Sequence, residues 1–264
     1  YYKMTGAIGW TDAQIEANTR EKENFYKDWG VVFAEFGTRR RHSYHVHDIV
    51  MRTLMQGYNS SFIGSSNVHF AMKYKVKPIG THAHEWFMFH AAEYSYKMSN
   101  ALSLEHWVDV FRGDLGVALS DTYTTDVFFK QFDKKFSKLF DGVRHDSGDP
   151  IEFAEKTIAH YKKMGVNPLS KYIIFSDGLN TEKVRAITEA CKGKIGKRTK
   201  PEILFKAIAE VCSEYVTLEE IATKTGRSTG YLKDRIIPEM LRLHIIERLF
   251  PEAPTNPHQK YRRI

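Results

Sequence analysis

The sequence is poor in cysteine and has no long apolar run, and these two shortages narrow the classes of protein that it can represent. Cys191 and Cys212 are the only cysteines in 264 residues, which fits a reducing compartment better than a disulfide-bonded extracellular fold. No apolar segment of the sequence approaches the ~18 residues that a membrane-spanning helix needs, and no secretory signal leads the chain. These absences predict a cytoplasmic protein.

The sequence also lacks a large excess of one charge sign, with 39 Lys and Arg against 32 Asp and Glu. The formal net charge is +7, with 27% charged and 42% hydrophobic residues, an ordinary composition for a globular protein. Residues 197–264 hold 13 Lys and Arg against 9 Asp and Glu, a balance of +4. This local excess is a weak indication of an anionic partner, because most such excesses are solvated surface.

Short apolar segments alternate with amphipathic, helix-like runs over the first 196 residues. This alternation predicts an α/β fold of parallel βα units, and in a βα barrel the loops after the strands meet at one face. Polar residues follow the apolar segments, so we expect them to form the rim of a site. The apolar segments are 31–41, 61–67, 77–85, 115–126, 142–150 and 172–180, the helical runs are 48–58, 126–140, 151–164 and 181–193, and the rim residues are Arg39, Arg40, His84, Asp121, Arg144, Asp146, Asp149, Asp177 and Asn180.

The pattern changes after Gly196, where a basic stretch, "KRTK", precedes a helix-like run. "LEEIATKTG" and "STGYLKDRIIPEMLRLH" then have the pattern of two helices joined at a glycine turn. "IIERLF" and "QKYRRI" flank a loop rich in Pro and Asn, as the two strands of a wing would. We therefore predict two domains, residues 1–196 and residues 197–264.

The segment "GTHAHEWF" places His82, His84 and Glu85 where an apolar stretch meets a helix. A His-x-His pair at a strand end binds zinc in some hydrolases. A neutral imidazole is also a competent nucleophile, and the free N–H groups of a helix start can hold a phosphoryl group. A pair of structural histidines is the third interpretation, and the arginines of "GTRRR" and "RHDSGDP" favour anionic substrates over a metal.

Five segments in order resemble the nicotinate phosphoribosyltransferase family: "EFGTRRR", "GTHAHEWF", "LGVALSDTYTTDVF", "GVRHDSGDPIEF" and "IIFSDGLN". The resemblance covers residues 1–196 and implies a βα barrel of the type II phosphoribosyltransferase kind, here incomplete. It also implies an enzyme of NAD biosynthesis that joins nicotinate to phosphoribosyl pyrophosphate, with ATP, Mg²⁺ and a homo-oligomeric state.

The resemblance assigns roles residue by residue. His84 would accept a phosphoryl group from ATP, and Glu85 would hold the other ring nitrogen of His84 or cap the helix. Asp146 would bind the ribose hydroxyls or Mg²⁺. The substrate-binding residues would be Phe36 on the pyridine ring, Arg39 at the nicotinate carboxylate, Arg144 at the phosphates, and Ser147, Asp177 and Gly178. For "SGDP" and "FSDGLN" a plain helix start is the competing interpretation.

Two departures from the family pattern predict impaired activity. The family's N-terminal domain is largely absent here, and "KRTKPEILF" stands where a glycine-rich loop would grip the 5′-phosphate. A barrel without that part would also have an open edge.

Residues 197–264 resemble the winged-helix domains at the ends of some bacterial ATP-binding regulator-like proteins. If this domain contacts DNA, Arg227, Tyr231, Lys233 and Arg235 would face the groove or the phosphates. A protein-contact role is equally open. The alternative function is therefore a DNA-binding regulator whose barrel senses nicotinate or a nucleotide.

Overall fold

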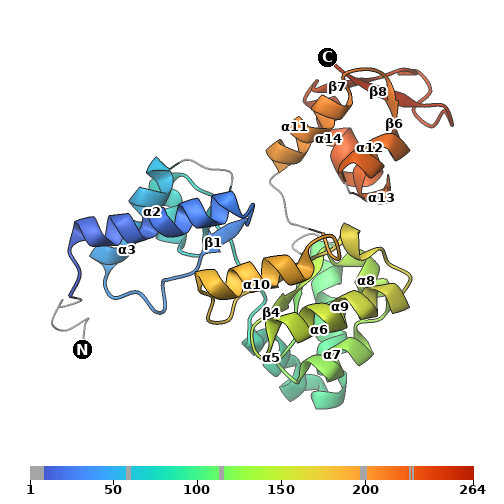
Figure 1. The fold of residues 1–264 in the computed structure, drawn as a ribbon. Coiled ribbons are helices and arrows are strands. Elements are labelled where there is room, and N and C mark those ends of the chain that lie inside the picture. The colour runs from blue at the N-terminus through green and yellow to red at the C-terminus, as the bar shows by residue number, and fades with distance from the viewer. Residues whose placement is uncertain (1–8, 58–60, 113–115, 197–200, 226, 228) are drawn as a thin grey trace. The chain divides into compact units, whose positions relative to one another are not determined.

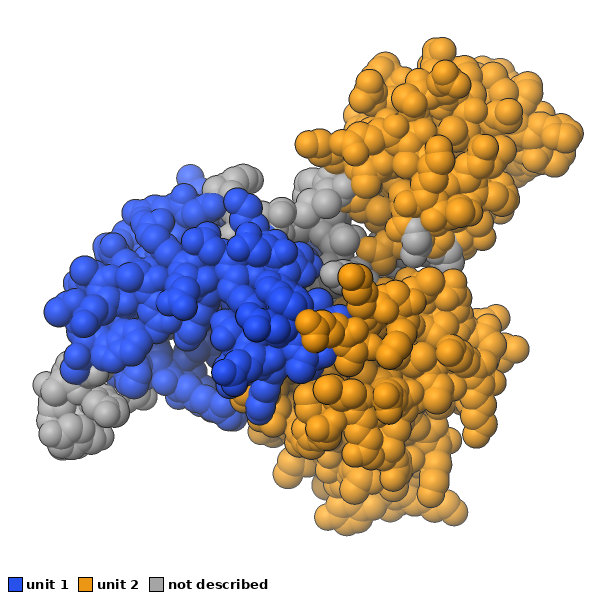
Figure 2. Space-filling view, viewed as in Figure 1, with its two compact units in different colours: residues 1–81, 180–188 blue, residues 82–179, 189–264 orange. Residues whose placement is uncertain are grey.

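The structure is a computed structural model that describes residues 9–57, 61–112, 116–196, 201–225, 227 and 229–264. The chain divides into two compact units: residues 1–81 with 180–188, and residues 82–179 with 189–264 (Figure 2). Among the described residues, no helix combines the length and the apolar character that crossing a membrane requires.

The described residues of the first unit up to Tyr74 form helices beside a short parallel sheet. The elements are α2 (Asp12–Asp28), β1 (Phe33–Glu35), α3 (Tyr44–Gln56), β2 (Phe62–Ser65) and α4 (Val68–Tyr74) (Figure 1). A capping box between Thr11 and Gln14 fixes the start of α2. Strands β1 and β2 pair in parallel, and Met51, Leu54, Phe62 and Phe70 form the core beside them.

The strand predicted within residues 77–85 is not formed. This segment makes one isolated bridge, between Ser65 and Pro78. Pro78 has no N–H to donate to a sheet, so pairing does not extend past this point.

The second unit contains a three-stranded parallel sheet in the order β3-β4-β5. Its core includes Phe132, Phe140, Val143 and Tyr161. The strands are β3 (Val117–Leu119), β4 (Gly142–His145) and β5 (Tyr172–Phe175). The helices of this region are α5 (His84–Tyr94), α6 (Tyr96–Phe111), α7 (Thr125–Gln131), α8 (Lys134–Leu139), α9 (Pro150–Lys163), the 3₁₀ turn η1 (Pro168–Ser170) and α10 (Thr181–Cys191) (Figure 1). The residues of α10 are divided between the two units.

The single helix predicted over residues 126–140 is two helices. Helix α7 ends at Gln131, and the Asp133 side chain accepts a hydrogen bond from the Phe136 N–H to start α8. An apolar pattern alone does not reveal this break, because Phe128, Phe132 and Phe136 are all buried on either side of it.

The mixed α/β class predicted from the sequence is confirmed by the parallel strands and their connecting helices. The incomplete barrel remains a prediction. The predicted domain boundary at residue 197 falls in residues 197–200, which lie outside the described part of the chain.

The C-terminal segment has its own elements and core. These are α11 (Pro201–Val211), β6 (Val216–Thr217), α12 (Leu218–Thr225), α13 (Thr229–Tyr231), the π-helical turn η2 (Leu232–Ile236), α14 (Ile237–Arg242), β7 (Ile246–Arg248) and β8 (Lys260–Arg263). The strands form an antiparallel sheet in the order β6-β8-β7. Ile208, Cys212, Ile221, Met240 and Ile246 are buried together beside it.

The helix predicted within residues 228–244 is found over residues 229–242, with a π-helical turn inside it. The hydrogen-bond pattern changes at η2, just before Pro238 in the first turn of α14. Proline lacks an N–H and its ring crowds the carbonyl four residues earlier, which here belongs to Asp234 in η2. The sequence contains this signal in "RIIPEM".

Candidate active site

The carboxyl ends of three parallel strands bring a polar cluster together in the second unit. Arg144 of β4 is in register with Leu119 of β3 and Ile174 of β5. Because parallel strands end at the same edge of a sheet, the residues that follow them are neighbours. Asp121, Asp146 and Ser176 occupy these positions.

His84 is the first residue of α5, and both nitrogens of its ring have partners. Nδ1 lies 3.1 Å from the Thr122 hydroxyl oxygen, and Nε2 lies 3.2 Å from Oδ2 of Asp146. Oδ1 of Asp121 is 3.9 Å from the same Nε2. The side chain is 39% exposed. The ring is therefore held in one orientation while it stays accessible to a substrate.

The expected contact between Glu85 and the His84 ring is wrong. Thr122 and Asp146 occupy the two ring nitrogens, and Glu85 is exposed. Helix α5 also begins without a side-chain cap hydrogen bond, since Ala83 holds the cap position. Glu85 lies in the first turn, where its charge suits the helix dipole.

Arg144 and Asp146 form the charged centre of the cluster. Their side chains meet at 2.7 Å and are 14% and 21% exposed. Arg144 also donates to the Ser176 hydroxyl at 2.8 Å and to the His82 carbonyl at 3.0 Å. Burial would raise the pKa of Asp146, but hydrogen bonds from Ser176, His84 and Arg144 and the charge of Arg144 lower it. Asp146 is thus a carboxylate at neutral pH.

The two carboxylate oxygens of Asp121 differ in their hydrogen bonding. Ser147 donates to its Oδ2, whereas its Oδ1 is buried and has no hydrogen-bond partner among the described residues. A buried acceptor without a donor is unusual and can be satisfied by a water molecule, an ion or a ligand. Thr122 and Ser176 were missed as individual site residues, although they stand inside the motifs "SDTYTTD" and "FSDGLN".

His82 lies in a different environment from His84. It is 3% exposed and packs edge-on against Trp107, with ring centroids 4.1 Å apart. Burial, together with the charge of Arg144, lowers the pKa of His82 to about 4. Across the described residues, no group of three or more His, Cys, Asp or Glu side chains is arranged to hold a metal ion.

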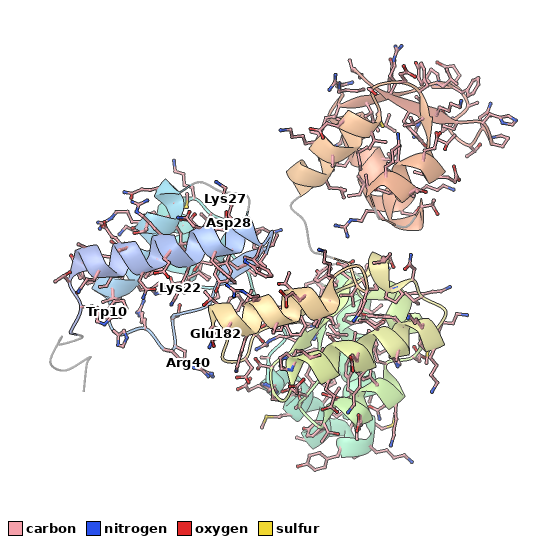
Figure 3. All side chains as sticks on the ribbon, viewed as in Figure 1. Trp10, Lys22, Lys27, Asp28, Arg40 and Glu182 are labelled. Atoms are coloured by element: carbon pink, nitrogen blue, oxygen red, sulfur yellow. The ribbon has the colours of Figure 1, made fainter. Side chains whose placement is uncertain are left out.

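Other predicted residues stand on exposed loops. Phe36 and Arg39 belong to the first unit, where both are exposed on the loop after β1, and Arg40 projects from the same loop (Figure 3). Asp177 and Gly178 are exposed after β5, and Gly178 has a positive φ of 50°.

The helix-start interpretation of "SGDP" holds at Asp149, which caps α9 through the N–H groups of Ile151 and Glu152. In the C-terminal segment, Arg227 is half-buried and Lys233 is exposed. The side chains of Tyr231 and Arg235 lie outside the described residues.

Comparison with known proteins finds the nicotinate phosphoribosyltransferase (NAPRTase) family matching residues 31–205. A nicotinate phosphoribosyltransferase of Chromohalobacter salexigens is 60% identical over 195 residues, which are 74% of this chain and 50% of that protein. One from Methanosarcina mazei is 51% identical over 166 residues, or 63% of this chain and 40% of that protein.

Solved structures agree. The crystal structure of the Porphyromonas gingivalis nicotinate phosphoribosyltransferase matches with a TM-score of 0.71 at 45% identity, over 75% of this chain and 50% of that one. The Vibrio cholerae structure matches with a TM-score of 0.64 at 38% identity, over 69% and 44% of the two chains. The chain spans about half the length of the curated relatives it matches.

Proposed function

We propose that this chain, which belongs to the nicotinate phosphoribosyltransferase family, carries the phosphoryl-accepting and substrate-binding part of an enzyme of NAD biosynthesis. The reaction joins nicotinate to phosphoribosyl pyrophosphate and uses ATP. The observation that carries the proposal is the His84 ring held between Thr122 and Asp146 at the sheet edge. We place the enzyme in the cytoplasm and expect a homo-oligomer.

The geometry around His84 suits phosphoryl acceptance. An ionised carboxylate can only accept, so Asp146 would keep a proton on Nε2 and make Nδ1 the nucleophilic nitrogen, which would exchange its contact with the Thr122 hydroxyl for the phosphorus. Nδ1 would attack the γ-phosphorus of ATP, the bond from that phosphorus to the ADP oxygen would break, and ADP would leave. Asp146 would then balance the positive charge on the phosphorylated ring, as the carboxylate does in a His–Asp pair.

The start of α5 supports the same role. Its first N–H groups have no side-chain cap, and uncapped N–H groups at a helix start bind phosphoryl oxygens. Arg144 and Ser147 lie in the same cluster and would bind phosphate oxygens of the second substrate. Phe36 and Arg39 would bind the pyridine ring and the carboxylate of nicotinate, and Asp177 and Gly178 would line the substrate-binding loop.

The residues present also fit Mg²⁺. This ion takes one or two protein carboxylates and completes its shell with phosphate oxygens and water. Asp121 and Asp146 would hold it, and the unused Oδ1 of Asp121 is the acceptor that a cation would satisfy. The ion would neutralise the charge of the pyrophosphate group.

Labelling with ATP tests this proposal. The chain incubated with γ-labelled ATP should acquire an acid-labile, base-stable label at His84, found by mapping the labelled peptide. A His84→Ala protein should acquire none, while His82→Gln should label normally, because His82 is buried away from the cluster edge. Equal labelling of the His84→Ala protein would refute the assignment.

For residues 197–264 we propose a winged-helix module. The support is the helix-turn-helix order of α11, α12 and α13–α14, the antiparallel β6-β8-β7 sheet and the separate core around Ile208 and Ile221. The loop between β7 and β8 would be the wing. Its contact with DNA is the second candidate function, favoured by the positive balance of this segment and by the exposed Lys233.

Salt titration separates DNA contact from protein contact. If the module binds duplex DNA, affinity should fall steeply between ~50 and ~200 mM salt, with a log–log slope of about −0.9 per neutralised phosphate. Lys233→Ala should make that slope shallower by about one unit if Lys233 meets a phosphate, whereas Lys192→Ala, outside the module, should not change it. No binding at the lower salt would assign the module to protein contact.

A further inference from the structure

Glu35, the last residue of β1, is the centre of a buried polar cluster in the first unit. Its Oε1 lies 2.9 Å from Nε2 of His47 on α3, and the Gly37 N–H donates to the same oxygen. The Ser65 hydroxyl donates to Oε2 at 2.5 Å. The Glu35 and His47 side chains are 8% and 3% exposed. The cluster is therefore sealed from solvent, unlike the edge that carries His84.

The cluster ties the loop after β1 to the loop after β2. The Ser65 hydroxyl accepts from the Asn67 N–H at 3.0 Å, and the Asn67 side chain donates to the Thr38 hydroxyl at 3.0 Å. The Ser66 N–H donates to the Glu35 carbonyl at 2.9 Å. Residues 36–38 are thus held from both the carboxylate and the neighbouring strand end.

The far end of the same loop is held through His47. Arg41 places Nη1 3.4 Å from Nδ1 of His47, and Ser43 caps α3 through the Val46 N–H at 3.1 Å. The His47 ring thus lies between the Arg41 guanidinium and the Glu35 carboxylate. Arg41, His47 and Glu35 therefore form one chain of contacts across residues 36–43.

The negative charge of Glu35 makes these contacts necessary for the stability of the buried cluster. Burial would raise the pKa of Glu35, but hydrogen bonds from His47, Ser65 and Gly37 lower it. A buried carboxylate is tolerated only while it stays paired and hydrogen-bonded. Opening the loop would expose the pairing and remove the Gly37 contact, so the carboxylate favours one closed arrangement of residues 36–43.

We propose that Glu35, acting through His47 and Ser65, is a positioning residue that fixes residues 36–43 and so presents Phe36 and Arg39 to nicotinate. The contact with nicotinate rests on the proposed function, whereas the fixing of the loop does not. Glu35 touches neither the reacting atoms nor the substrate in this assignment. Its removal should weaken nicotinate binding and spare the phosphorylation of His84.

Limited trypsin digestion of the full chain tests the fixing of the loop. The loop carries Arg39, Arg40 and Arg41, and the appearance of fragment ends at these residues, measured by mass spectrometry, reports its opening. Glu35→Gln and the milder Ser65→Ala should each speed cleavage there by about tenfold, the factor that the loss of one charge-assisted hydrogen bond gives.

The matched control is Asp48→Asn, on α3 beside His47. It weakens the contacts of Asp48 with Lys73 and Tyr74 of α4 and leaves the contacts of the loop in place. It should leave cleavage at residues 39–41 unchanged. Wild-type cleavage rates in both Glu35→Gln and Ser65→Ala would overturn the proposal. Equal acceleration in Asp48→Asn would also overturn it, since the effect would then be general loosening of the unit.

Equilibrium dialysis with labelled nicotinate, paired with His84 labelling from ATP, tests the consequence. Glu35→Gln should weaken nicotinate binding by about tenfold or more and leave His84 labelling unchanged, and Asp48→Asn should change neither. Nicotinate binding as tight as wild type in Glu35→Gln would overturn the positioning role toward Phe36 and Arg39. If the wild-type chain bound no nicotinate while Glu35→Gln still opened the loop, the proposed function would fail and the role in the loop would stand.

Discussion

Among the described residues, two histidine–carboxylate pairs have their acidic residue at a strand end, and the pairs differ in solvent access. His84 and Asp146 are 39% and 21% exposed, whereas His47 and Glu35 are 3% and 8% exposed. The first pair keeps a ring nitrogen within reach of a substrate. The second is buried and contacts Gly37, Ser65 and Arg41. The same two residue types therefore suit the proposed chemistry in one place and the proposed fixing of a loop in the other.

The largest stability effect should come from His82, which is buried and has no acidic partner among the described residues. Its folded-state pKa is about 4 against an ordinary value of 6.5. The unfolded chain therefore binds a proton that the folded chain refuses between pH 6.5 and 4, and stability falls as pH is lowered through this range. The loss should approach about 3 kcal/mol in the free energy of unfolding.

Urea unfolding of wild type and His82→Gln at several pH values between 4 and 7 measures this effect. The variant should lose most of the excess acid sensitivity, because its amide does not titrate. Parallel curves for the two proteins would show that His82 is solvated or paired, and would remove the contrast drawn between His82 and its neighbour His84.

A smaller effect is expected from Arg144→Met, which leaves the Asp146 carboxylate without its cation. Breaking a fully buried ion pair costs about 3–5 kcal/mol, and the partial exposure of this pair should reduce the cost to about 2 kcal/mol. Arg52→Met breaks the exposed pair with Glu16 and should cost well under about 1 kcal/mol. Chemical denaturation of both variants makes the comparison, and equal costs would mean that Arg144 is effectively a surface residue.

The smallest effect should follow Asp149→Ala. This residue caps α9 through two N–H groups and takes no part in the contacts of His84. Its loss should lower the free energy of unfolding by about 1 kcal/mol and leave ATP-dependent labelling of His84 unchanged. A marked drop in labelling in a protein that is still folded would extend the site to the start of α9.

Sequence patterns predicted the α/β class and most of its elements because strand and helix periods differ strongly. They placed β1, β2, β3, β4 and β5 within the expected segments, and α3, α9 and α10 close to the expected bounds. They failed at Pro78 and at Asp133. At these positions one residue's hydrogen-bonding capacity overrides an otherwise continuous apolar pattern.

For the candidate site, motif positions indicated His84, Arg144 and Asp146 but not the contacts between them. Glu85 was given the role that Thr122 and Asp146 hold, because adjacency in sequence says little about which side chains a ring nitrogen meets. Glu35, His47 and Ser65 were missed for the same reason. Their contacts span 30 positions between Glu35 and Ser65, and no local pattern encodes them.

The most direct test compares the rate of ATP-dependent labelling at His84 in wild type, Asp146→Asn and Glu35→Gln. It asks whether the His84–Asp146 pair serves phosphoryl acceptance and the His47–Glu35 pair does not. Asp146→Asn should slow labelling by about 10²-fold or more, because the ring loses the carboxylate that orients it and balances its charge. Glu35→Gln should label at the wild-type rate. Slowing of Glu35→Gln to the level of Asp146→Asn, or a normal rate in Asp146→Asn, would contradict the account.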